Sequence, residues 1–337
     1  MHDQRRRFLR RAAVGLGMPW CAALGVEPVR VIKFSHVVAP DTPKGQAALL
    51  FKRLVEERSA GRVRVEIYPN STLYKDKEEL EALQIGAVQM LAPSLSKFGP
   101  LGVKQFELFD LPYLFPNEAA FRTVTQGPIG AGLFARLADK GIQGLAYWTA
   151  GFHVYSANRP LLAPGDLKGL KLRIPPSKVL EANVRTLGAL PQVLAFSEVY
   201  QALESGVVDG TENVPSSYTS QKWYEVQKHM VLTYHTHTGY ATIMNRKFWD
   251  DLPPPLQGVV SLAMKEATDH EAALVANENL AALNTIRASG KTHIQELNDG
   301  QRDQWRAALL PVHQQMESRI GRDLIDAVVR TSARASA

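Results

Sequence analysis

The sequence has almost no cysteine and no long apolar segment. Its single cysteine among 337 residues is Cys21, near the N-terminus, so no disulfide is expected. No stretch has the roughly 18 unbroken apolar residues of a membrane-spanning helix. A Gly-x-Ser-x-Gly nucleophile motif, a phosphate-binding glycine loop and a zinc-ligand motif are also absent. These absences exclude a disulfide scaffold and give no support to an exported enzyme.

Excess positive charge is confined to the N-terminus. The formal net charge is +6, but residues 1–26 hold five arginines and one aspartate, and the remainder carries 34 basic and 32 acidic residues. A nucleic-acid partner is therefore not expected. The arginines precede a mildly apolar run over 12–25, which predicts an export signal over 1–26 and a periplasmic location. A basic nucleic-acid arm is the alternative. The order Arg-Arg-Arg-Phe-Leu-Arg over 5–10 also fits the twin-arginine pattern, although ordinary signal peptides are basic too.

Apolar residues that alternate or form short runs predict strands separated by helices. The predicted strands are residues 29–34, 62–68, 88–92, 170–174, 192–195, 239–244 and one that starts at 207–208. The predicted helices between them are residues 43–59, 76–86 with its capping box over 76–79, 177–187 and 197–205. Two β-α-β units of this kind indicate an α/β chain with two lobes, each with a mostly parallel sheet.

Several helix starts have recognisable capping residues. Thr42 and Pro43 are a good N-cap and first residue for the first helix. Asp76 and Glu79 have capping-box spacing before the second helix, and Glu79 is interpreted as part of a solvated acidic start. A helical pattern over 255–289 would be about 50 Å long, so it either braces both lobes or contains a kink.

Nine short segments together resemble one known family. They are residues 34–39, 42–45, 67–70, 92–98, 109–115 (Phe-Asp-Leu-Pro-Tyr-Leu-Phe), 156–160, 166–175, 195–203 and 208–213 (Val-Asp-Gly-Thr-Glu-Asn). In this order they resemble the periplasmic solute-binding proteins of TRAP transporters, in the dicarboxylate-binding (DctP-type) branch. The resemblance covers nearly all of the chain after the predicted export signal.

The resemblance implies a two-lobed periplasmic binding protein fold with crossing strands, a long bridging helix and a ligand cleft between the lobes. Lobe I is expected to contain residues 27–150 and 239–278, and lobe II residues 151–238 and 279–337. Proteins of this family do no chemistry on the ligand, so neither enzymatic activity nor a cofactor is expected. The implied partners are a small carboxylate and the small and large membrane subunits of the transporter.

Arg173 and Asn213 are the first candidates for ligand contact. Arg173 lies near the end of a predicted strand, and its guanidinium presents two parallel donors that match a carboxylate. An arginine between Leu172 and Ile174 is otherwise a costly buried charge, unless it is paired or exposed. Asn213 ends another strand and offers a donor and an acceptor. In similar proteins both matching residues hold the ligand carboxylate.

Lys44, His36, Ser94 and Ser96 are weaker candidates. Lys44 lies in the first turn of a helix, where free backbone N–H groups favour anions. His36 follows the first strand, although an isolated histidine is more often packed than ligating. Ser94 and Ser96 follow the third strand, where a parallel sheet presents ligand contacts. They could equally cap the next helix.

His153 departs from the family pattern. Similar dicarboxylate-binding proteins tend to have lysine or arginine here, and a histidine is only partly charged near neutral pH. The second carboxylate is therefore either held more weakly or replaced by a hydroxyl or a ring.

Two further histidines form a His-x-His pattern. His235 and His237 could face one side of a strand, but no third ligand stands at recognised spacing, so no metal site is expected. His237 and Tyr240 are instead predicted to line the pocket.

Three functions remain open. The first is a transport receptor for a small organic acid, most simply a C4-dicarboxylate such as malate, succinate or fumarate. The second is an exported sensor that presents its ligand-bound closed form to a signalling partner. The third, with least support, is an exported α/β enzyme.

Overall fold

Residues 28–335 are described in a computed structural model of the chain. The predicted export signal over 1–26, with its twin-arginine pattern and Cys21, lies outside these residues. Within the described part, no helix combines the length and the apolarity that a membrane crossing requires.

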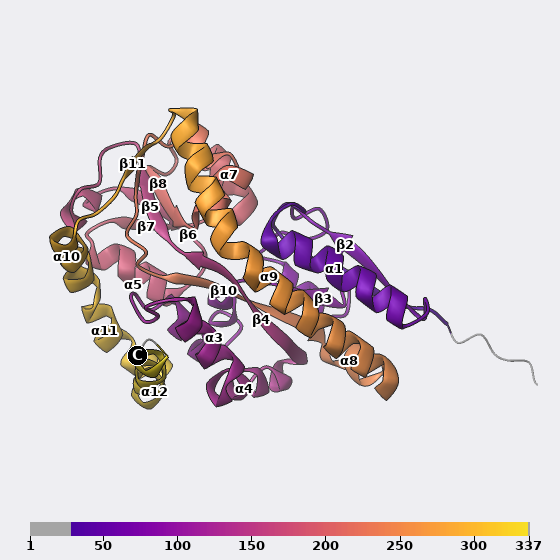
Figure 1. Cartoon of the computed structure of the whole chain (residues 1–337). Helices are drawn as coiled ribbons and strands as arrows, with labels where there is room; N and C mark the ends of the chain where they lie inside the picture. Colours follow the sequence, from indigo (N-terminus) through magenta and orange to yellow (C-terminus); the bar gives the residue numbers. More distant parts are fainter. Residues whose placement is uncertain (1–27, 336–337) are drawn as a thin grey trace, which may run out of the picture.

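Two separate β-sheets form two lobes, which confirms the predicted two-lobed α/β fold (Figure 1). The first sheet has the order β2-β1-β3-β10-β4, and the second has the order β11-β9-β5-β8-β6-β7. The first contains β1 (Arg30–Ser35), β2 (Val63–Tyr68), β3 (Met90–Leu91), β4 (Ile142–Phe152) and β10 (His237–Asn245). The second contains β5 (Val154–Ala157), β6 (Lys171–Ile174), β7 (Leu190–Val193), β8 (Gly210–Asn213), β9 (His229–Val231) and β11 (His293–Gln295).

Each lobe contains the parallel unit that the sequence predicts. In the first sheet, β1 pairs in parallel with β2 and β3, and helices α1 (Pro43–Arg58) and α2 (Glu79–Gln84) make the connections. In the second sheet, β6 pairs in parallel with β7 and β8 through α5 (Lys178–Thr186) and α6 (Val199–Glu204). Arg173, near the carboxyl end of β6, and Asn213, at the end of β8, line the space between the lobes, where parallel sheets commonly present polar groups.

The chain crosses between the lobes along three elements. Strand β4 ends at Phe152 in the first sheet and β5 begins at Val154 in the second, with only His153 between them. The chain returns between β9 and β10. The backbone N–H of His153 donates to Thr236 O at 2.8 Å, so the two crossings lie side by side. The third element, helix α9 (Pro254–Ser289), is continuous and packs against α1 and β4 at one end and α7 (Pro215–Ser220) at the other (Figure 1). The long helix therefore braces both lobes.

The remaining helices cover the outer faces of the lobes. They are α3 (Glu118–Gln126), α4 (Pro128–Ala135), α8 (Arg246–Asp250), α10 (Asp299–Leu309), α11 (Pro311–Ile320) and α12 (Arg322–Arg334). Helix α12 packs against α3, and its Ile325 and Val328 join the aromatic core around Phe109 and Phe121. The expected lobe boundaries stay a prediction. For their C-terminal part, the contacts of α12 favour assignment to lobe I.

The start of helix α1 is fixed tightly, and this fixes the backbone of Lys44. Thr42 is the N-cap, and its hydroxyl accepts from the backbone N–H of Gly45 at 3.2 Å, as predicted. Gly45 packs directly on the preceding loop. A Cβ atom at this position would lie 2.6 Å from Pro40 O and closer still to Ala39 O.

Gly45→Ala is expected to destabilise the protein by about 1–3 kcal/mol, because the added methyl meets backbone atoms that cannot move independently. The matched control is Gly258→Ala in α9, where a Cβ would meet no atom within 4 Å. That change should stabilise by roughly 0.5–1 kcal/mol through helix propensity. Urea denaturation followed by tryptophan fluorescence measures both. Equal stability of the two variants would contradict the packing described for α1.

Candidate ligand-binding site

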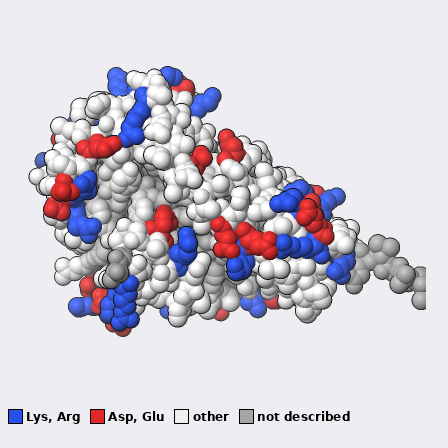
Figure 2. Space-filling model, in the orientation of Figure 1, with Lys and Arg blue, Asp and Glu red and all other residues white. Residues whose placement is uncertain are grey.

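A cavity lies between the lobes at the crossing of the strands, and its wall is rich in charged side chains. The first lobe contributes Lys44, Asp76, Glu79, Ser94, Ser96, Lys97, Asp110, Thr238 and Tyr240. The second contributes His153, Arg173, Phe196 and Asn213. The outer surface differs: in Figure 2, basic and acidic side chains are interspersed over the face shown. The concentration of buried charge is what distinguishes this cavity.

Arg173 projects into the cavity from β6 and is 1% exposed. Its Nε and Nη2 donate to the carbonyl oxygen of Leu194 at 3.1 and 2.8 Å. Within residues 28–335, no carboxylate lies within ion-pair distance of the guanidinium. Burial lowers the pKa of Arg173, but a guanidinium stays charged at neutral pH. Arg173 is therefore a buried cation that the protein orients, and Asp76, Glu212 and Glu198 attract it only from beyond ion-pair distance.

Lys44 reaches the cavity from the first turn of α1 and is 3% exposed. Its Nζ donates to Ala92 O at 3.2 Å and lies 3.5 Å from the centre of the Tyr240 ring, which is a cation–π contact. No carboxylate in the described part of the chain lies within ion-pair distance of this nitrogen. Burial lowers the pKa of Lys44 to about 7. Lys44 is thus a second cation without an acid partner, from the opposite lobe to Arg173.

Lys97, in the 3-10 helix η1 (Leu95–Phe98), is a cation that the sequence analysis missed. Its Nζ lies 2.9 Å from an Asp76 oxygen and 3.3 Å from a Glu79 oxygen, and all three side chains are buried. Burial opposes ionisation of Asp76, but the charge of Lys97 lowers its pKa below the usual value, whereas burial raises the pKa of Glu79. Lys97 is therefore neutralised by the protein itself.

The predicted role of Asp76 and Glu79 as a capping box is wrong. The N-cap of α2 is Glu78, and no side chain caps it. Glu79 is 1% exposed and pairs with Lys97, so its interpretation as part of a solvated helix start is wrong as well. The spacing of the acids matched a cap, while Lys97, some twenty residues later, is the partner that determines their orientation.

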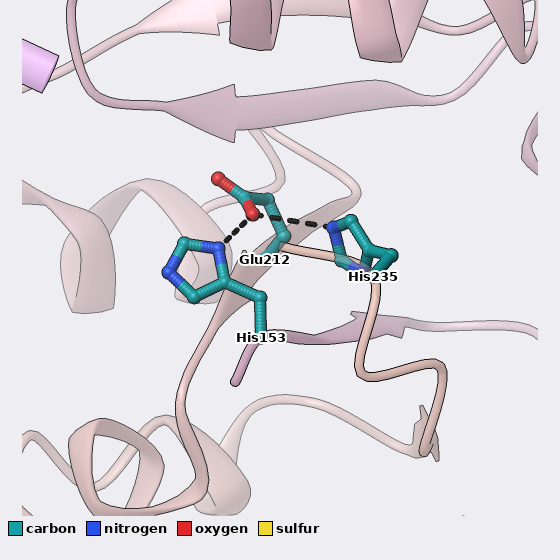
Figure 3. Close-up of side chains that lie close together, drawn as sticks. All are labelled: His153, Glu212 and His235. Atoms are coloured by element: carbon teal, nitrogen blue, oxygen red, sulfur yellow. Dashed lines mark hydrogen bonds and ion pairs between the residues drawn. The ribbon is translucent and has the colours of Figure 1, made fainter. Parts of the chain in front are cut away.

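His153, Glu212 and His235 form a second cluster where the strands cross (Figure 3). Nδ1 of His153 contacts one oxygen of Glu212, and Nε2 of His235 lies 3.4 Å from the same oxygen. Burial opposes ionisation of Glu212, but the two histidines together lower its pKa. An ionised carboxylate only accepts hydrogen bonds, so His153 Nδ1 is the donor. Burial lowers the pKa of His235, which keeps that ring neutral. Glu212 was missed because it lies in the Thr-Glu-Asn segment beside the more obvious Asn213.

Some of the other predicted residues line the cavity and some do not. Ser94, Ser96, Asn213 and Tyr240 line the cavity. The hydroxyls of Ser94 and Ser96 lie 3.0 Å apart. Asn213 Oδ1 accepts from the N–H of Val214 at 2.9 Å, and its amide nitrogen has no partner in the described chain. That nitrogen is available as a donor to a ligand.

His36 and His237 are not part of the cavity wall. His36 packs edge-on against Phe34, and burial lowers its pKa to about 3, so the ring is neutral. His237 stacks on Phe121 at 4.0 Å, and its Nε2 lies 2.9 Å from Thr149 Oγ1 and 3.1 Å from Glu118. His235 stacks instead on Tyr155, so the His-x-His pair points into two different clusters and cannot share one metal ion.

The cluster of His153, Glu212 and His235 has the ligand types that zinc takes, and its ligand atoms lie within 4.8 Å of one another. In the structure, His153 Nδ1 and the Glu212 oxygen are in direct hydrogen-bond contact. The geometry is that of a hydrogen-bonded pair. The expectation of no metal stays a prediction.

The lobes touch each other beside the cavity. The N–H of Phe196 donates to Asp76 Oδ1 at 3.3 Å, and Lys75 pairs with Glu198 at 3.2 Å. These contacts join the segment before α2 to the segment before α6. They close one side of the cavity, so the two lobes are in a closed arrangement.

The fold and the charged interlobe cavity define a solute-binding protein, and the chain belongs to the bacterial extracellular solute-binding protein family 7, whose profile matches residues 34–319. The predicted resemblance is thereby confirmed. The chain is 56% identical over 307 residues to the C4-dicarboxylate-binding periplasmic protein DctP of Rhodobacter capsulatus, covering 91% of this chain and 92% of the relative. It is 42% identical over 302 residues to the C4-dicarboxylate-binding protein DctB of Bacillus subtilis, covering 89% and 86%.

Solved structures of solute-binding proteins are similar to this chain as well. A TRAP periplasmic solute-binding protein of Shewanella oneidensis with bound succinate superimposes with a TM-score of 0.88 at 40% identity, covering 90% of this chain and 99% of that one. A protein of the same class from Pseudomonas aeruginosa with bound L-malate gives a TM-score of 0.83 at 42% identity, covering 86% and 100%. Members of this family are solute-binding proteins and not enzymes.

Lys97→Met is expected to destabilise the protein by roughly 3–5 kcal/mol, because it leaves Asp76 and Glu79 buried without their cation. Lys265→Met is the control, since Lys265 and its partner Asp269 are both exposed. The control should change stability by less than about 0.5 kcal/mol. Chemical denaturation compares the two. A loss for Lys97→Met no larger than that of the control would disprove the buried network.

Proposed function

We propose that this protein is the extracytoplasmic receptor of a TRAP-type secondary transporter and that it binds a C4-dicarboxylate such as succinate, malate or fumarate. The observation that carries the proposal is the pair of unneutralised cations, Lys44 from one lobe and Arg173 from the other. Two buried cations facing one cavity require two negative charges to compensate them. A dicarboxylate supplies both on one small molecule.

The remaining polar groups of the wall suit the same ligand. A guanidinium binds a carboxylate through parallel hydrogen bonds, and the free amide nitrogen of Asn213 adds a donor in the same lobe. Ser94 and Ser96 lie near the Lys44 side and supply hydroxyls. His153 is balanced by Glu212, so in this proposal it contributes a hydrogen bond and not the second charge.

The relatives support this ligand class. Those from Rhodobacter capsulatus and Bacillus subtilis are C4-dicarboxylate-binding proteins, and the similar solved structures hold succinate and L-malate. In the proposed cycle, the ligand bridges the lobes and stabilises the closed form. The small and large membrane subunits then receive the ligand from that form. The proposed location is the periplasm, reached through the signal over residues 1–26, by the twin-arginine route or the ordinary one.

A sensor that presents the same closed form to a signalling protein remains the second candidate. The feature that would serve it is the interlobe contact of Lys75 and Asp76 with the segment at Phe196–Glu198, because this surface exists only when the lobes close. The cavity itself serves both functions equally. Neighbouring genes for small and large multi-span membrane proteins would favour the transport receptor.

Arg173→Met is expected to lose most of its affinity for succinate, because the buried ligand carboxylate loses its cation. Truncating one partner of such a pair costs about 2–5 kcal/mol, so the Kd should rise by at least about 30-fold. The fold should persist, since the substitution removes a buried charge that no acid of the described chain contacts directly. Thermal shift and calorimetry with succinate measure both properties, with Lys265→Met as the control. Affinity within threefold of wild type would refute the role of Arg173.

Butyrate tests the need for two charges, because it keeps the four-carbon chain and replaces one carboxylate by a methyl group. Leaving Lys44 or Arg173 without a partner should weaken binding at least about 100-fold relative to succinate. A thermal-shift series with succinate, malate, fumarate and butyrate makes the comparison. Similar shifts for butyrate and succinate would exclude the two-cation site.

A further inference from the structure

The ammonium group of Lys44 has few protein groups around it that stabilise its positive charge. An ammonium has three donors. Here it has one carbonyl acceptor, Ala92 O at 3.2 Å, and the face of the Tyr240 ring at 3.5 Å. The side chain is 3% exposed, so little water reaches it. A buried ammonium without an anion is strongly disfavoured relative to the neutral amine.

The charged groups that face Lys44 from neighbouring elements do not supply the anion that a buried ammonium needs. Lys97 on η1 repels it. Asp76 and Glu79 attract it, but both are already paired with Lys97. Glu271 on α9 also attracts it, but not from ion-pair distance, and burial raises the pKa of Glu271 well above its usual value, which disfavours its charged form.

Two histidines complete the surroundings. His36, at the end of β1, is a neutral ring. His153 lines the same cavity, and its Nδ1 is hydrogen-bonded to Glu212. Burial therefore dominates, and it lowers the pKa of Lys44 to about 7. Near neutral pH the amine without ligand exists in both protonation states.

We propose that the protein takes up a proton together with its dicarboxylate and that Lys44 binds this proton. The inference rests on the proposed function, in which a ligand carboxylate reaches Lys44. That carboxylate is the anion that the amine lacks, so binding favours the ammonium. The coupling is reciprocal, and protonation of Lys44 strengthens ligand binding by the same factor. Arg173 remains charged throughout and takes up nothing.

The sign of the pH effect follows from this linkage. Well below pH 7 the ammonium is already present, so binding is strong and takes up no proton. Above pH 7 the amine must first be protonated, so affinity falls as uptake approaches one proton per ligand. Affinity for succinate should therefore fall roughly tenfold between pH 6 and pH 8.

Calorimetry of the full chain with succinate tests the inference directly. Titrations at pH 6, 7 and 8 in two buffers of different ionisation enthalpy give the number of protons bound with the ligand. The expected uptake is close to zero at pH 6, about half a proton at pH 7 and close to one at pH 8. Tight binding with no buffer dependence at pH 8 would overturn proton uptake and leave the proposed function standing. Absence of binding to succinate, malate and fumarate at every pH would overturn the proposed function itself.

Lys44→Arg identifies the group. A guanidinium keeps its charge, so this variant should bind with no proton uptake and with an affinity that is level between pH 6 and pH 8. Lys44→Met is a second variant, for the case in which the larger arginine side chain of Lys44→Arg blocks the cavity. Its residual binding should also lose the pH dependence. Lys265→Met, at an exposed ion pair, should keep the wild-type profile. Undiminished proton uptake in Lys44→Arg or Lys44→Met would assign the proton to another group and refute the inference.

Discussion

The cost of buried charge is the constraint on which the rest of this structure depends. Three cationic side chains, Lys44, Lys97 and Arg173, share one interlobe cavity with the carboxylates of Asp76 and Glu79. The protein neutralises Lys97 internally and leaves the other two without a carboxylate at ion-pair distance in the described chain. A cavity in which every cation was paired would be more stable and would have no reason to attract an anion. In the proposed function, the two cations without a direct ion pair are what attract an anionic ligand to this cavity.

The arrangement of the strands determines which charges remain unpaired. Lys44 and Lys97 come from the first lobe and Arg173 from the second, on strands and helix starts whose polar ends face the gap. The two unpaired cations thus belong to different lobes, and a molecule with two carboxylates connects the lobes as it compensates them. The contacts of Asp76 with Phe196 and of Lys75 with Glu198 accompany the same closure. Helix α9 packs on both lobes and connects them beside the crossing strands.

Local sequence patterns predicted the helices and strands well. They predicted the residues of the cavity less completely. Alternating apolar residues placed β1 and β2 within one residue of their observed ends, and Thr42 with Pro43 located the start of α1, because these signals depend on neighbours along the chain. The partners of buried charges are distant in sequence. Asp76 had the spacing of a cap, yet its partner is Lys97, and Glu212 meets His153 from 59 residues away. His36 and His237 end up in packed clusters because the direction of a side chain at a strand end depends on its tertiary neighbours. Sequence could indicate which residue types reach the cleft, but not which of them remain unpaired there.

The carboxylate of Glu212 determines how much charge a residue at position 153 adds to the cavity. A histidine there raised doubt about a second carboxylate, since similar proteins tend to carry lysine or arginine. Glu212 is fully buried beside it, and its ionised carboxylate balances any cation at that position. A lysine or arginine at 153 would therefore stand beside this carboxylate and add little net charge to the cavity. In the proposed function, the residue at 153 contributes to the shape and the hydrogen-bond donors of that wall, and Lys44 and Arg173 supply the charge for the ligand. The histidine is thus compatible with a dicarboxylate.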